Sequence, residues 1–265
     1  MIAAAKTLDI DGQPMPVWDA GPDKLPVLMF LHGWGLAPPA YRHLLTALSL
    51  RYRIVAPFIP GLCWNRPERA YRSHHDLAAV VLAVADRLGI ERVHLAGQST
   101  GGGIAAAMSA GRPAAIQSLV LIDASGLPRF ASKWPAWART RELVAETARE
   151  GVTGPGLAMT RSFIWNLVAG RGAMIRAANI PLNEDLSTTF AAIKAPTLIL
   201  WGGRDLLFPL ATAHEIQSLI PASTLHVVDG VHHSWEINGH REAARFIAAH
   251  IDRHTIDARS SQFLA

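Results

Sequence analysis

The chain alternates between short apolar runs and longer segments whose apolar residues recur at helical spacing. The run VLMFL at 27–31 has no polar position, which is typical of a strand buried on both faces of a parallel sheet. Helices are expected over 39–50, 76–88 and 241–250, with Gly89 ending the second. Because strands and helices alternate, we expect a doubly wound, mostly parallel α/β sheet. The other runs that predict parallel strands lie at 53–57, 93–96, 118–122, 197–201 and 224–228.

Three segments depart from this alternation. Residues 7–18 hold Asp11-Gly12 between two short strands, which predicts an antiparallel hairpin. Residues 126–194 contain no convincing strand and are interpreted as a helical insertion between two strands of the sheet. Residues 255–265 are expected to form a loosely held tail. The predicted units are a core domain over 1–125 and 195–265 and a helical domain over 126–194, with helices at 139–150 and 157–169.

The composition indicates a folded globular protein. Half of the 265 residues are apolar and 17% are charged, so a large core can form. The net charge is +4, but no block of Lys and Arg stands out, which favours a mixed solvated surface over a nucleic-acid site. With Cys63 alone, no intrachain disulfide can form. Lys6 and Asp9 interrupt any signal-peptide core and the longest apolar run, 78–85, is too short to span a bilayer, so we expect a cytoplasmic protein with no membrane partner.

The most informative motif is G-Q-S-T-G at 97–101, between an apolar strand and a helix rich in Gly and Ala. A strand-to-helix turn this tight forces its middle residue into a strained backbone conformation, and small neighbours are needed around it. The helix N-terminus behind Ser99 also favours developing negative charge. We therefore expect Ser99 to be a nucleophile, the alternative being an ordinary N-cap serine.

A serine nucleophile needs a base, and the base needs an orienting carboxylate. Among the 12 histidines, His232 and His233 directly follow the last predicted strand, and one of them is expected to be the base. Asp205 follows the strand before it on a Gly-Gly-Arg-Asp turn and is the preferred carboxylate, with Asp123 as its rival. The chain order Ser, Asp, His fits this scaffold.

Acyl transfer also requires hydrogen-bond donors for an oxyanion. We expect one to be the backbone N–H of Thr100, the residue after the nucleophile. The other is the N–H of Trp34, in the loop after the strand at 27–31, where Gly33 and Gly35 allow a sharp turn. The alternative is an ordinary glycine loop.

The chain resembles the α/β-hydrolase superfamily in five motifs spread over nearly its whole length. The resemblance implies an eight-stranded, mostly parallel sheet flanked by helices, with 126–194 as a helical cap and no cofactor or metal. Relatives commonly carry G-x-x-H before the catalytic histidine, which implies His233 as the base, with His232 in the place of a small residue. The motifs are H-G-W (32–34), A-P-x-x-P-G (56–61), G-x-S-x-G-G (97–102), L-W-G-x-x-D-x-x-x-P (200–209) and G-x-x-H (230–233).

Two departures from the family pattern, a missing aspartate and a missing glycine in one loop, limit analogies of substrate. Relatives usually read A-P-D-x-P-G-x-G-x-S where this chain has APFIPGLCWN at 56–65, which suggests a differently packed loop beside the site. A serine at position 99 also differs from the aspartate of members similar to haloalkane dehalogenases and epoxide hydrolases.

We expect hydrolysis of a carboxylic ester of a small, apolar substrate, by a monomer or homodimer. Perhydrolysis is a second reading, since the run at 99–103 (STGGG) is similar to cofactor-free haloperoxidase-like enzymes, and thioester, lactone or C–C bond hydrolysis would use the same parts. A ligand-binding protein without turnover is an alternative of another class. The expected acyl pocket, which could equally be the core of the cap, comprises Trp134, Trp137, Phe163 and Trp165.

Overall fold

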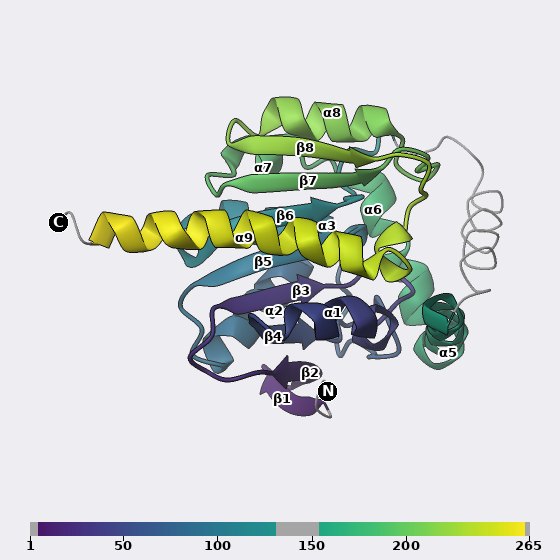
Figure 1. Cartoon of the computed structure of the whole chain (residues 1–265). Coiled ribbons are helices and arrows are strands. Elements are labelled where there is room, and N and C mark those ends of the chain that lie inside the picture. Colours follow the sequence, from purple (N-terminus) through teal and green to yellow (C-terminus); the bar gives the residue numbers. More distant parts are fainter. Residues whose placement is uncertain (1–4, 131–153, 263–265) are drawn as a thin grey trace.

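A computed structural model describes residues 5–130 and 154–262. Its centre is an eight-stranded sheet in the order β1-β2-β4-β3-β5-β6-β7-β8 (Figure 1). The strands from β4 to β8 in this order pair in parallel, whereas β1 and β2 pair antiparallel. The strands are β1 (Lys6–Ile10), β2 (Gln13–Ala20), β3 (Val27–Leu31), β4 (Arg53–Pro57), β5 (Val93–Gln98), β6 (Ile116–Ile122), β7 (Thr197–Gly202) and β8 (Ser223–Val228).

Helices cover both faces of this sheet (Figure 1). α1 and α9 pack on one face and α2, α3, α7 and α8 on the other. The two cores take alternate residues of β3, because successive side chains of a strand point to opposite faces: Leu28 and Phe30 enter one core, Met29 and Leu31 the other. The helices are α1 (Arg42–Leu48), α2 (His74–Arg87), α3 (Thr100–Gly111), α5 (Gly154–Ala177), α6 (Ile180–Asn183), α7 (Ser187–Ala192), α8 (Leu210–Leu219) and α9 (His240–Gln262), with 3₁₀ turns at Pro38–Tyr41, Pro113–Ala115 and Trp235–Ile237.

The predicted hairpin and its turn are present. Asp11 and Gly12 both have positive φ, 53° and 82°, which is the conformation of a type I′ turn between twisted strands. Asp9 accepts a hydrogen bond from the Gly12 amide at 2.8 Å. On β2, Asp19 receives two hydrogen bonds of 2.7 Å from the guanidinium of Arg53, which fastens the hairpin to β4.

The C-terminal helix differs from the expectation. We predicted its end near residue 250 and a loose tail from 255, but α9 continues to Gln262. The predicted helix end was wrong because residues 251–255 still contact the core: Ile251 is buried, and Asp252 accepts a hydrogen bond from the Tyr52 hydroxyl at 2.8 Å. Thr255 bonds the carbonyl of Ile251 at 2.9 Å and the buried His94 of β5 at 3.2 Å. α8, between β7 and β8, was not predicted from the sequence at all.

The described part of the insertion, 154–194, is helical, and the expected helix at 157–169 lies within α5. The expected helix at 139–150 lies outside the described residues. Asn166 attaches α5 to the core, because its side chain, 1% exposed, donates to the carbonyl of Gly35 at 3.0 Å. This contact brings α5 against the loop after β3.

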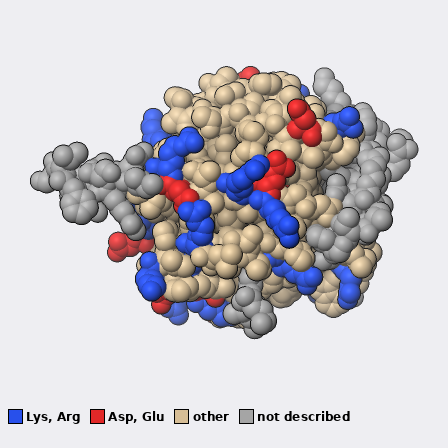
Figure 2. Space-filling view, in the orientation of Figure 1, with Lys and Arg blue, Asp and Glu red and all other residues tan. Residues whose placement is uncertain are grey.

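Charge is dispersed over the face that α1 and α9 cover. Figure 2 shows Lys, Arg, Asp and Glu interspersed there, without a continuous patch of one sign. Across the parts of the chain that the structure describes, no helix combines the length and the apolar character needed to cross a lipid bilayer.

Candidate active site

The carboxyl ends of the parallel strands share one edge of the sheet, which is where sheets of this type build their sites. At this edge, the turn from β5 into α3 holds Ser99 at φ 54° and ψ −121°, a conformation that few non-glycine residues adopt. The turn has no room for side chains on its glycines: a Cβ at Gly97 would lie 2.2 Å from the Gly101 carbonyl, and one at Gly101 would lie 2.2 Å from the Leu31 carbonyl. The strained turn inferred from the G-x-S-x-G motif is present.

Backbone hydrogen bonds hold the strained residue in place. The Ser99 amide donates to the carbonyl of Ile122 at 2.9 Å. The Ser99 carbonyl accepts from the amides of Gly102, Gly103 and Ser125 at 2.9, 3.2 and 3.0 Å. Strain of this kind costs about 1–3 kcal/mol and persists only where surrounding contacts fix it, as these do.

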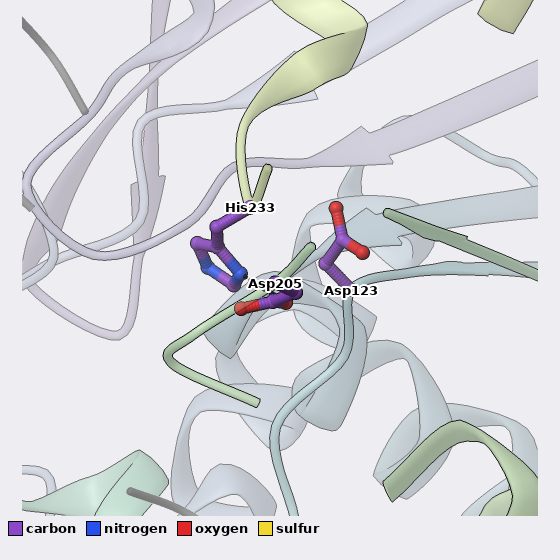
Figure 3. A group of neighbouring side chains, drawn as sticks. All are labelled: Asp123, Asp205 and His233. Atoms are coloured by element: carbon purple, nitrogen blue, oxygen red, sulfur yellow. Dashed lines mark hydrogen bonds and ion pairs between the residues drawn. The ribbon is translucent and has the colours of Figure 1, made fainter. Parts of the chain in front are cut away.

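A histidine and a carboxylate meet on the neighbouring loops. His233, after β8, and Asp205, after β7, lie 2.7 Å apart between Nδ1 and Oδ2 and are only 3% and 4% exposed (Figure 3). The other oxygen of Asp205 accepts from the amides of Leu207 and Phe208 at 2.8 and 2.9 Å, which fixes the carboxylate plane. A carboxylate can only accept, so Nδ1 of His233 carries the proton of this bond.

The structure shows which histidine and which aspartate pair with each other, a choice that the residues alone left open. His232 is half-buried and bonds neither carboxylate. Asp123 is fully buried with φ 45°, and its Oδ1 accepts from the Gly202 amide at 2.8 Å, which holds the end of β7. Asp123 therefore lies beside the pair as a support of the loop, while Asp205 bonds the imidazole.

Asp123, Asp205 and His233 are also close enough to be considered as a metal site. Their possible ligand atoms lie within 4.8 Å of one another (Figure 3). These side chains, however, already make other bonds: His233 Nδ1 holds Asp205, and each carboxylate accepts a backbone amide. This donor set is better suited to orienting an imidazole than to chelating a cation.

The loop after β3 lies directly against the Ser99 turn. A Cβ at Gly33 would come within 3.1 Å of the Ser99 Cβ and 2.3 Å of the Gln98 amide oxygen, so the backbone passes close to the turn. Among the described residues, no acceptor takes the backbone N–H of Trp34 or of Thr100. Both N–H groups belong to the segments that flank Ser99.

His32 gives this loop its shape, a role that sequence reasoning missed. The His32 ring is fully buried and accepts a hydrogen bond from the Ile59 amide at Nε2, at 2.9 Å. Nδ1 therefore carries the proton and donates to the Gly33 carbonyl, also at 2.9 Å. Burial lowers the pKa of His32 to about 4, so the ring stays neutral at pH 7. The H-G pair of the H-G-W motif was the available signal.

A second missed network joins the three loops of the site. The Gly33 amide donates to the Tyr41 hydroxyl at 3.3 Å, and this hydroxyl donates to Gln98 Oε1 at 2.9 Å. The Gln98 amide nitrogen in turn lies 3.4 Å from the carbonyl of His233. Burial, and after it the charge of Glu236, raises the pKa of Tyr41 well above its usual value, so the hydroxyl remains a donor. Gln98, the residue before the serine of G-x-S-x-G, thus links the loop after β3 to the loop after β8.

The expected aromatic pocket residues occupy different places. Phe163 is buried beside the loop after β3, with its ring 6.0 Å from that of Trp34 in an edge-on arrangement. Trp165 is 62% exposed and sits about 200° around α5 from Phe163, so the structure does not bring it to the site. Trp134 and Trp137 lie outside the described residues.

Comparison with known proteins agrees with this architecture. The sequence profile of the α/β hydrolase fold family matches residues 26–178. The chain belongs to that family. It is 29% identical over 236 residues to 2-hydroxy-6-oxononadienedioate/2-hydroxy-6-oxononatrienedioate hydrolase 2 of Pseudomonas putida, covering 79% of this chain and 82% of that protein.

Two further similar proteins differ in what their names say. The magnesium-chelatase 30 kDa subunit of Rhodobacter capsulatus is 26% identical over 245 residues, 83% of this chain and 85% of that protein. Among solved structures, the meta-cleavage product hydrolase CumD of Pseudomonas fluorescens IP01 superposes with a TM-score of 0.79 at 23% identity, covering 94% of this chain and 98% of that one. The last likeness is one of fold.

Proposed function

We propose that this α/β-hydrolase is a serine hydrolase that cleaves a carboxylic ester or related acyl bond through an acyl-enzyme. The observation that carries the proposal is the 2.7 Å bond between His233 and Asp205, on the sheet edge where Ser99 occupies its strained turn. Gln98, which directly precedes Ser99 in the chain, contacts the carbonyl of His233. This contact supports the proposal that the imidazole can reach Ser99.

In this mechanism, Ser99 Oγ attacks the carbonyl carbon while its proton passes to Nε2 of His233. Asp205 stabilises the imidazolium through Nδ1. The bond to the leaving oxygen then breaks, and His233 returns the proton to that oxygen. Water repeats the sequence on the acyl-enzyme, which releases the carboxylic acid and restores Ser99.

The backbone N–H groups of Trp34 and Thr100 would hold the oxyanion of each tetrahedral intermediate. The absence of an acceptor for either group among the described residues supports this role. Each such donor contributes about 2.7–4 kcal/mol to lowering the barrier. The bonds of His32 keep the Trp34 loop in position.

For the substrate, we favour a small ester whose acyl part is apolar. Phe163 and Trp34 are the described aromatic residues that support this choice, because they pack together at the loop after β3. Hydrolysis of a C–C bond is the second candidate, supported by the name of the Pseudomonas putida relative. Perhydrolysis would need the same residues with peroxide in place of water.

Turnover of short p-nitrophenyl esters by wild type and Ser99→Ala tests the proposal. We expect release of p-nitrophenol from the wild type alone, and equal rates would refute it. A parallel assay with a 2-hydroxy-6-oxo-dienoate distinguishes C–C hydrolysis, and one with acetate and peroxide distinguishes perhydrolysis. Binding of an ester without turnover would favour a ligand-binding protein instead.

We further propose that the protein acts in the cytoplasm as a monomer or homodimer. Cell fractionation and light scattering test these two points independently of activity.

A further inference from the structure

A second chain of serine, histidine and carboxylate lies beside the Ser99 turn. Ser125 Oγ is 2.9 Å from Nε2 of His74, and Nδ1 of His74 is 2.6 Å from Oε2 of Glu184. Ser125 follows β6, His74 begins α2, and Glu184 lies between α6 and α7. Ser125 and His74 are 0% exposed, so neither can meet a substrate from solvent.

This chain touches the Ser99 turn at two points. The Ser125 amide donates to the Ser99 carbonyl at 3.0 Å. The His74 ring rests against the first turn of α3, where a Cβ on Gly103 would lie 2.4 Å from its Cδ2 and 2.5 Å from its Nε2. That turn starts at Thr100, whose N–H belongs to the proposed oxyanion hole.

The hydrogen bonds fix which atom carries each proton. Glu184 also accepts from the His74 amide and from Nδ1 of His75, the latter at 2.8 Å. Burial raises the pKa of Glu184, but these bonds outweigh burial and lower it to about 2, so the carboxylate is ionised at pH 7. Nδ1 of His74 therefore donates to Glu184, and Nε2 accepts from the Ser125 hydroxyl.

We propose that Glu184, His74 and Ser125 form a positioning relay that sets the place of the Ser99 backbone and of the Thr100 amide. Glu184 belongs to the returning end of the helical insertion, so the relay ties that segment to the catalytic turn. The role attributed to Ser99 rests on the proposed function. The effect of the relay on the position of the Ser99 backbone can be measured separately from activity.

Two relay variants and one matched control test the proposal. Ser125→Ala removes the hydroxyl, and Gly103→Ala displaces the His74 ring without removing any titratable group. His75→Asn is the control, because His75 is exposed and bonds the other oxygen of Glu184 without reaching Ser125. Each variant is compared with wild type for ester hydrolysis, for the rate of labelling by a fluorophosphonate, for melting temperature, and for hydrogen–deuterium exchange of the peptide 97–104.

A small displacement of reacting groups lowers rates steeply, so we expect kcat and the labelling rate to fall about tenfold in both relay variants. KM should stay unchanged, because no relay residue contacts substrate. Exchange of 97–104 should be faster in both relay variants and unchanged in His75→Asn. If Gly103→Ala does not fold, Glu184→Gln replaces it, with the same direction and a smaller effect.

The proposal is overturned if the relay variants melt earlier but keep wild-type kcat and wild-type exchange of 97–104, since the three residues would then only stabilise the fold. If the wild type shows no serine-dependent turnover, the proposed hydrolase function is refuted. Hydrogen–deuterium exchange of 97–104 then tests the relay by itself. Faster exchange in the relay variants than in His75→Asn supports the relay, and equal exchange overturns it.

Discussion

Replacing Asp205 by asparagine tests the step of the proposed mechanism in which a carboxylate orients the base. In the native site, Oδ1 accepts two amides, from Leu207 and Phe208, and Oδ2 accepts the proton of His233 Nδ1 at 2.7 Å. The single oxygen of the substituted side chain would keep the two backbone donors, so its NH₂ would face the imidazole. Two donors cannot face each other, and the ring must move its proton to Nε2. An imidazole protonated there cannot accept the Ser99 proton.

This change of tautomer is expected to lower kcat by about 10⁴-fold, or roughly 5.5 kcal/mol in the barrier, with the fold retained. The measurement is kcat for a p-nitrophenyl ester at pH 7, with circular dichroism as the check of folding. Asp123→Asn is the matched control, since Asp123 accepts from the Gly202 amide instead of holding the imidazole. The reasoning is refuted if Asp123→Asn loses more activity than Asp205→Asn.

Three further predictions follow from the same contacts. Gly101→Ala places a methyl group 2.2 Å from the Leu31 carbonyl, so we expect a loss of roughly 3 kcal/mol or more in unfolding free energy by urea titration, and a variant as stable as wild type would contradict this. His32→Ala frees the Ile59 amide and loosens the Trp34 loop, so kcat should fall about 10–100-fold with little change in KM, and an effect on KM alone would count against an oxyanion role. Hydrogen bonds lower the pKa of Glu184 from 4.5 to about 2, so the stability that its carboxylate contributes is complete above pH 4.5 and is lost as the pH falls from 4.5 to about 2. The melting temperature of Glu184→Gln should therefore fall less steeply with acid than that of wild type. Parallel curves of melting temperature against pH would exclude this contribution.

The parts of this molecule that short-range rules control could be predicted from its sequence. The parallel strands follow from continuous apolar runs, and the Asp11-Gly12 turn follows from its need for positive φ. The turn at Ser99 could be predicted for a similar reason, because the backbone segments at 97 and 101 pack too closely to leave room for a Cβ atom and therefore require glycine.

Contacts between distant residues could not be predicted in the same way. Gln98 and His233 are 135 residues apart, and His74 and Glu184 are 110 apart, so no local pattern relates them. Trp165 shows the related difficulty on a helix, where an aromatic residue suggests a pocket but only packing decides which side faces it. α9 continues beyond residue 250, where Asp252 and Thr255 make polar contacts with Tyr52 and His94 that hydropathy does not record.

The central claim is that Ser99 is an activated nucleophile whose base is His233. The most direct test treats the folded protein with a fluorophosphonate and maps the adduct by peptide mass spectrometry, in wild type and in His233→Ala. The account predicts one phosphonyl group on Ser99 of the wild type and labelling slowed by orders of magnitude in the variant. Absence of an adduct on folded wild type, or an adduct on a different residue, would contradict it.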